Sequence, residues 1–171
     1  MNKVNAFCKK EDFYKSKDID DGKLLVRYNE TESGDFMEYG EAVVDNTPEA
    51  MRELMTEAIT EYDQSPAVNS FVIDGKSIWL NRETRLVLRQ RFVAEKATGA
   101  TKTSLWYGTY VFNLTVDDAI RMLNEIEVYA CKCYDVTASH KAAVLKLDTI
   151  EDLLVYDNKT GYPEKLEFKT T

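Results

Sequence analysis

The stretch Gly75-Lys76-Ser77 carries the three letters that close a nucleotide-binding P-loop. A P-loop needs a further glycine five residues before its second one, so that backbone N–H groups converge on the phosphates, and here that position holds Ser70. Apolar, β-favouring residues lie on both sides, over 71–73 and 78–80. Because Asp74-Gly75 tolerates the positive φ of a tight turn, we predict a β-hairpin here rather than a nucleotide site.

Cysteine and histidine are the residues that could hold a transition metal. Cys131 and Cys133 fall inside a predicted helix, where a separation of two residues points them about 200° apart around the axis. The single histidine, His140, has no partner at metal-ligand spacing. We therefore expect no metal and no cofactor, with Cys133 in the core and Cys131 at its edge.

Ser139-His140 could supply a nucleophile and a base. Adjacent residues on a helix point roughly 100° apart, so the pair forms no dyad by adjacency, and we expect His140 at the surface. The acidic pairs Asp117-Asp118 and Glu151-Asp152 each fall in the first turn of a predicted helix, where the backbone dipole stabilises carboxylates. The sequence thus predicts a protein that is not an enzyme. A small hydrolase or nucleotide-dependent enzyme using Ser139, His140 or Lys76 remains an alternative.

A basic stripe interrupts the acidic composition on the predicted helix 82–98. Apolar residues flank the stripe on both sides, with Leu88 and Phe92 on one flank and Leu86, Val93 and Ala97 on the other. One flank must cover the helix's own sheet, and the other could receive the acidic helix 49–61 or another polypeptide. The residues expected at a partner contact are Arg82, Arg85, Arg89, Lys96, Leu88 and Phe92. Trp79 and Trp106 are expected to pack in the core.

The charge of the chain is unevenly distributed. Of the 22 basic and 30 acidic residues, 8 and 16 lie in residues 1–64, so the whole net charge of −8 is N-terminal. This shift occurs at the Pro-containing stretch 64–67 and predicts two parts, an acidic N-terminal segment 1–64 and a C-terminal domain 65–171. The negative charge of the N-terminal segment disfavours nucleic acid and anionic membranes as partners. No apolar run in the sequence has the length of a membrane span.

Local patterns place the elements of an α+β protein. Strands are predicted over 23–28 and 37–44 around a turn at 29–35, followed by a helix that Thr47 caps and Pro48 begins. Glu49, Glu53, Glu57 and Glu61 form its solvent face.

In the C-terminal part the order hairpin then helix occurs twice. Strands 70–73 and 78–80 precede the helix 82–98, and strands 103–107 and 110–114 precede a helix 116–133. These tandem units predict a four-stranded antiparallel sheet covered by helices. Two short helices should follow, 138–146 capped by Thr137 and 149–156 capped by Asp148, before an extended tail over 161–168.

Residues 66–168 resemble a phage-encoded domain of unknown function that is common among tail-region proteins of tailed phages and prophages. The residues that carry the resemblance are Asn69–Lys76, Ile78–Leu80, Glu95–Gly99, Leu105-Trp106, Leu123–Tyr134, Val136–Val144 and Gly161–Phe168. This family has no established catalytic residues, so the resemblance implies none for this chain.

This resemblance implies a non-enzymatic structural component of a tailed phage virion, in the tail or neck region, made in the host cytoplasm. Its partners would be other virion proteins, with homo-oligomerisation possible and no direct contact with nucleic acid or membrane. A non-virion chaperone for tail or fibre assembly is the alternative.

Overall fold

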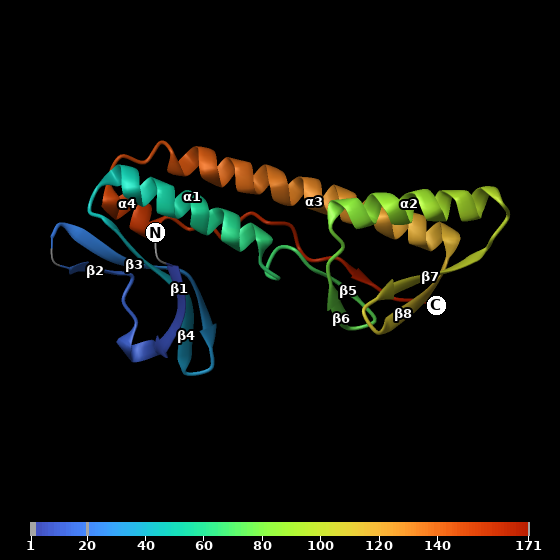
Figure 1. Cartoon of the computed structure of the whole chain (residues 1–171), viewed down its shortest axis with the longest axis horizontal. Helices are drawn as coiled ribbons and strands as arrows, with labels where there is room; N and C mark the ends of the chain where they lie inside the picture. The colour runs from blue at the N-terminus through green and yellow to red at the C-terminus, as the bar shows by residue number, and fades with distance from the viewer. Residues whose placement is uncertain (1–2, 20, 171) are drawn as a thin grey trace. The chain divides into compact units, whose positions relative to one another are not determined.

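A computed structural model describes residues 3–19 and 21–170 and has an α+β fold, with helices and antiparallel sheets (Figure 1). The chain forms two compact units. Unit 1 contains the residues up to Asp63 together with Val136–Thr160, and unit 2 contains Gln64–Asp135 together with the residues from Gly161 onward. The first part of unit 1 ends at Asp63, one residue before the boundary expected at 64/65. Residues 136–160, which the sequence placed in the C-terminal domain, return to the N-terminal part.

The sheet of unit 1 has four antiparallel strands in the order β1-β4-β3-β2. They span Lys3–Lys9 (β1), Ser16–Ile19 (β2), Lys23–Ser33 (β3) and Phe36–Asp45 (β4), and a short 3-10 helix η1, Lys10–Asp12, follows β1. The sequence predicted β3 and β4 but neither edge strand. Most of the predicted turn at 29–35 belongs to β3, since the hairpin closes at Gly34, whose φ of 59° suits glycine.

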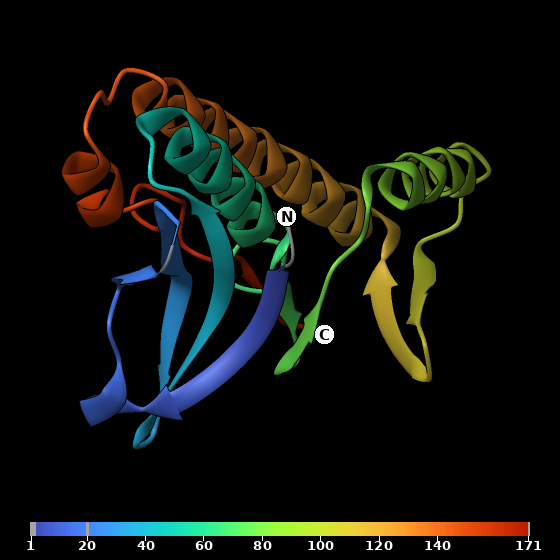
Figure 2. The ribbon, with the colours of Figure 1, turned by 60° about the vertical axis from the view of Figure 1, so that its left-hand side comes forward.

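Helix α1, Pro48–Gln64, covers one face of this sheet (Figure 2). Its backbone starts where predicted, with the Thr47 hydroxyl accepting a hydrogen bond from the Ala50 N–H at 3.3 Å. The core of unit 1 joins apolar residues of β3, β4 and α1 to Val144 and Leu153. The four glutamates of α1 are exposed, as predicted.

Unit 2 begins with the predicted hairpin, β5 (Phe71–Ile73) and β6 (Lys76–Ile78). Asp74 and Gly75 have φ values of 48° and 74°, the left-handed pair of a two-residue hairpin turn, so Gly75-Lys76-Ser77 belongs to a hairpin. Helix α2, Arg82–Ala97, follows behind its predicted cap, because the Asn81 side chain accepts from the Thr84 N–H at 2.8 Å.

The second hairpin, β7 (Lys102–Tyr107) and β8 (Tyr110–Thr115), stands in a sheet of its own. The single four-stranded sheet that the tandem units predicted is therefore wrong. The free edge of β5 is taken instead by the tail strand β9, Glu167–Phe168, which runs parallel to it. The Val72 and Asp74 N–H groups donate to the carbonyls of Leu166 and Phe168 at 2.9 and 3.1 Å.

Helix α3, Val116–Val144, is one continuous helix of 29 residues. The predicted break before residue 138 is wrong, because no glycine or proline interrupts this part of the chain. Thr137 is buried and its hydroxyl donates to Asp63 at 2.8 Å, which leaves no capping role for it. Helix α4, Ile150–Val155, is capped by Thr149 rather than by Asp148.

Candidate interaction surface on α2 and the polar cluster at the β3 bulge

The inward side of α2 is fixed by Arg85. Its guanidinium is buried, with Nε donating to Glu127 of α3 at 2.8 Å and Nη1 donating to the Leu80 carbonyl at 2.7 Å. The same group lies 5.4 Å from the ring centre of Trp79. Phe92 is fully buried in the core of unit 2, and Leu88 packs against that core. These residues hold α2 to its own unit.

Two further cations of the stripe contact side chains of α3. Arg89 Nη1 donates to the Asn124 side-chain oxygen at 2.6 Å, and Lys96 Nζ lies 2.7 Å from Asp117 Oδ1. Arg82 is exposed and joins no ion pair among the described residues. Of the six residues expected at a partner contact, Arg85 and Phe92 are thus inside unit 2. Contact through Arg82, Arg89, Lys96 or Leu88 stays a prediction.

The opposite flank of α2 faces solvent. Leu86, Val87 and Val93 are 53%, 60% and 50% exposed. An exposed apolar flank on the side of a helix away from its core is a candidate interaction surface. Sequence reasoning recognised Leu86 and Val93 as a second apolar flank but did not select this flank as the contact.

The hairpin β7-β8 adds a second exposed apolar site in the same unit. Trp106 is 64% exposed and pairs across the strands with Val111, which is also exposed. The neighbouring residues Leu105 and Phe112 point to the other face and are buried. The prediction that Trp106 packs in the core is therefore wrong, because the period of two along β7 directs it outward. Trp79 is half-buried and packs edge-on against Phe71 and Tyr129.

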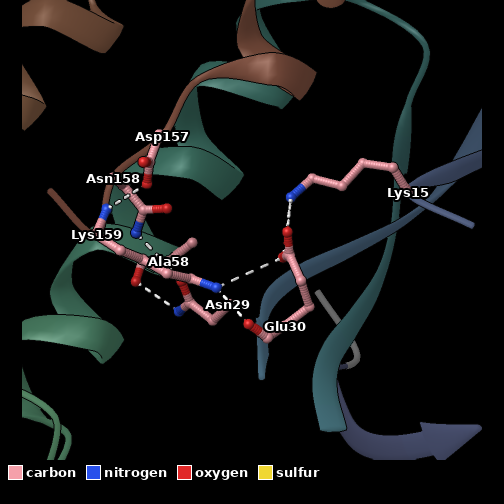
Figure 3. Close-up of polar contacts among 7 residues, drawn as sticks. All are labelled: Lys15, Asn29, Glu30, Ala58, Asp157, Asn158 and Lys159. Atoms are coloured by element: carbon pink, nitrogen blue, oxygen red, sulfur yellow. Dashed lines mark hydrogen bonds and ion pairs between the residues drawn. The ribbon is translucent and has the colours of Figure 1, made fainter. Parts of the chain in front are cut away.

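A polar cluster forms at a bulge in β3, where the pairing with β4 shifts between Tyr28 and Thr31 (Figure 3). Lys15 Nζ lies 2.8 and 2.9 Å from the two carboxylate oxygens of Glu30. Lys159 donates to the Glu30 backbone carbonyl, and its Nζ is 4.0 Å from Glu30 Oε2. One carboxylate therefore has two lysines beside it.

Burial and charge act differently on the groups of this cluster. Burial alone would raise the pKa of Glu30, but the hydrogen bond from Lys15, a backbone hydrogen bond and the two lysine charges hold that pKa below its usual value. Burial lowers the pKa of Lys159, and the nearby charge of Glu30 opposes this effect only in part. The lowered pKa keeps the Glu30 carboxyl group ionised, so that it can pair with both lysines.

Two asparagines complete the cluster (Figure 3). Asn29 has a φ of 52°, its Nδ2 donates to the Ala58 carbonyl of α1 at 2.7 Å, and its Oδ1 accepts from buried Asn158 at 3.1 Å. Segment 157–160 is thus fastened to the bulge and to α1. We assign this cluster a structural role within unit 1. The only signal for it in the sequence is weak, an Asn-Glu pair inside a run of turn-forming residues.

His140 also contacts the C-terminal part of unit 1. Its Nδ1 lies 2.7 Å from the Tyr156 hydroxyl and its Nε2 lies 2.8 Å from the Thr160 carbonyl oxygen. The expected surface position is only partly right, since His140 is half-buried, while its neighbour Ser139 is exposed. Both ring nitrogens have partners within unit 1, and the pair Ser139-His140 forms no dyad.

Arg27 was missed by sequence reasoning and lies on the face of the unit 1 sheet away from α1. Its guanidinium carbon is 3.7 and 4.5 Å from the ring centres of Tyr14 and Tyr39, and Nε donates to Glu41 at 3.0 Å. In other proteins, aromatic faces bind cationic ligands in this way. Here the guanidinium of Arg27 itself lies over the two tyrosine rings. A cation following a leucine-valine pair in a strand was the only local signal.

A cavity of about 470 Å³ lies between α3 and the tail. Its lining combines Val128, Tyr129, Pro163 and Leu166 with the polar or charged residues Asn124, Glu125, Lys132 and Glu164. Cys133 is buried, as predicted, whereas Cys131, expected at the edge of the core, is exposed. Residues 3–19 and 21–170 contain no group of three or more potential metal ligands, and none of their helices has the length and apolar character to cross a membrane.

Comparisons with models of known protein families, with curated proteins and with solved structures give no match for this chain. The class that the chain itself defines is therefore the coarse one, an α+β protein of two units with an exposed apolar face on α2.

Proposed function

We propose that this protein acts through protein–protein contact as a non-enzymatic structural component of a tailed phage virion, in its tail or neck region. The observation that carries the contact role is the exposed apolar flank of α2, Leu86, Val87 and Val93. The placement in a virion is supported by the resemblance of residues 66–168 to the phage domain.

The hairpin β7-β8 supports the same proposal. Trp106 and Val111 present a large apolar pair to solvent, and tryptophan is enriched among the residues that dominate binding energy at interfaces. Two exposed apolar sites within one unit suit a part that contacts neighbours in an assembly.

Mass spectrometry of gradient-purified particles tests this function. Peptides from the chain in stoichiometric amounts support a virion component, whereas their absence from particles but presence in assembling lysates supports a non-virion assembly chaperone. The contact role is tested by Val93→Asp, with Val155→Asp as control, since Val155 of unit 1 is also exposed. We expect only the first substitution to reduce incorporation. Equal incorporation of both variants contradicts contact through α2.

A further inference from the structure

The exposed face of α2 has the spacing of a coiled-coil seam. Leu86, Gln90, Val93 and Ala97 follow one another at alternating steps of four and three residues, and all four are exposed. Side chains at this spacing form one line along a helix and insert between those of a facing helix. Val87 and Ala94 widen the seam on one side.

The other edge of the seam is basic. Arg82, Arg89 and Lys96 recur every seven residues, so they flank the seam at equivalent positions. Arg89 is hydrogen-bonded to a neutral amide, and neither Arg89 nor Arg82 joins an ion pair among the described residues. Lys96 is paired with Asp117 at the surface, where such a pair is worth little. Glu83, at the N-terminal end of the seam, is the one acidic residue in line with it.

For a helix that docks antiparallel to α2, this edge selects the charge of the partner. In an antiparallel pair of two α2 helices, equivalent edges meet, so Arg82 would face Lys96 of the second copy and Arg89 would face Arg89. Like charges at these positions oppose pairing. A helix with a basic flank is disfavoured for the same reason, whereas carboxylates at the matching positions would pair with all three cations.

We propose that the α2 seam docks an amphipathic helix of another protein whose flanking positions are acidic. This inference rests on the proposed contact function and specifies its partner. The partner helix carries apolar residues at heptad spacing over about two heptads, the length that the 16 residues of α2 can cover, and Asp or Glu opposite Arg82, Arg89 and Lys96.

Two synthetic helical peptides test the proposal against the purified full chain. Both carry the same leucine seam, and they differ only in having glutamate or lysine at the flanking positions. Fluorescence anisotropy should show the acidic peptide binding about tenfold or more tightly than the basic one, with affinity falling as salt is raised. The double substitution Arg82→Glu with Arg89→Glu should reverse the preference.

Substitutions on the seam separate docking from folding. Leu86→Asp and Val93→Asp lie at exposed positions, so their urea unfolding should match that of the wild type while binding of the acidic peptide weakens by about tenfold or more. Val155→Asp is the control and should leave binding unchanged.

The proposal is overturned if the acidic peptide does not bind, if both peptides bind equally, or if Val93→Asp binds like the wild type. It is also overturned if the wild type is a dimer in light scattering and Val93→Asp makes it a monomer, since the occupant is then a second copy. Loss of particle incorporation in Val93→Asp without any preference for the acidic peptide would leave the proposed function standing and refute this partner chemistry.

Discussion

Replacing Arg85 by methionine should destabilise unit 2 strongly, although Arg85 belongs to a stripe that reads as surface in the sequence. Methionine keeps most of the apolar stem but removes the two hydrogen bonds to Glu127 and the Leu80 carbonyl. Hydrogen bonds from a charged donor contribute about 1.5–3 kcal/mol each. Glu127 is 41% exposed on its side chain and can turn to water, so its share must be discounted, whereas the Leu80 carbonyl loses its buried donor. We expect a net loss of about 2–4 kcal/mol.

Tryptophan fluorescence during urea unfolding measures this loss, because Trp79 and Trp106 both lie in unit 2 and Trp79 stacks on the guanidinium. With a slope of about 2 kcal/mol per M, the unfolding midpoint should fall by about 1–2 M urea. Arg82→Met, in the same helix and exposed, is the matched control and should change stability by about 0.5 kcal/mol or less. If the two variants unfold at the same midpoint, Arg85 does not hold α2 to its unit and becomes available to a partner.

Two predictions concern unit 1. Gly40→Ala should cost about 1–3 kcal/mol, because an added Cβ would lie 2.5 Å from the ring of buried Tyr28 across the strand pair. In a Tyr28→Ala background the same change should cost much less, and circular dichroism unfolding that gives additive costs would contradict the clash. Glu30→Gln should destabilise unit 1 at neutral pH. This difference from wild type should be full above the unfolded-state pKa of Glu30 and should shrink as pH falls from there through the lowered folded-state pKa, because the carboxylate is protonated over that range. Urea unfolding across a pH series measures this, and a difference that stays constant into acid would count against the ion pairs with Lys15 and Lys159.

The elements that sequence reasoning predicted are those fixed by local chemistry. Thr47 followed by Pro48 starts a helix, Asn81 caps another, and Asp74-Gly75 makes a two-residue turn, each through neighbours in the sequence. What it missed depends on distant partners. The tail was expected to be extended, but its pairing as β9 needs the unpaired edge of β5, and Thr137, expected as a cap, instead donates to Asp63, 74 residues away.

The candidate surface was predictable in composition but not in orientation. The sequence shows two apolar flanks on α2, and hydrophobic spacing alone cannot tell which one meets the core. Burial of Phe92 and the exposure of Leu86 and Val93 decide the question. The cluster at Glu30 was hidden for a related reason, since Lys159 reaches it over 129 residues and a run of turn-forming residues gives no sign of a bulged strand.

Because Val144 and Leu153 are part of the core of unit 1, the first 63 residues cannot complete that core while they are alone outside the ribosome. The apolar face formed by the sheet and α1 therefore stays uncovered until residues up to 160 have emerged. Unit 2, apart from its tail strand, is synthesised during that interval. A nascent chain arrested after α2 should therefore be protease-sensitive in its first 63 residues, and one arrested beyond residue 160 with a linker should be protected there.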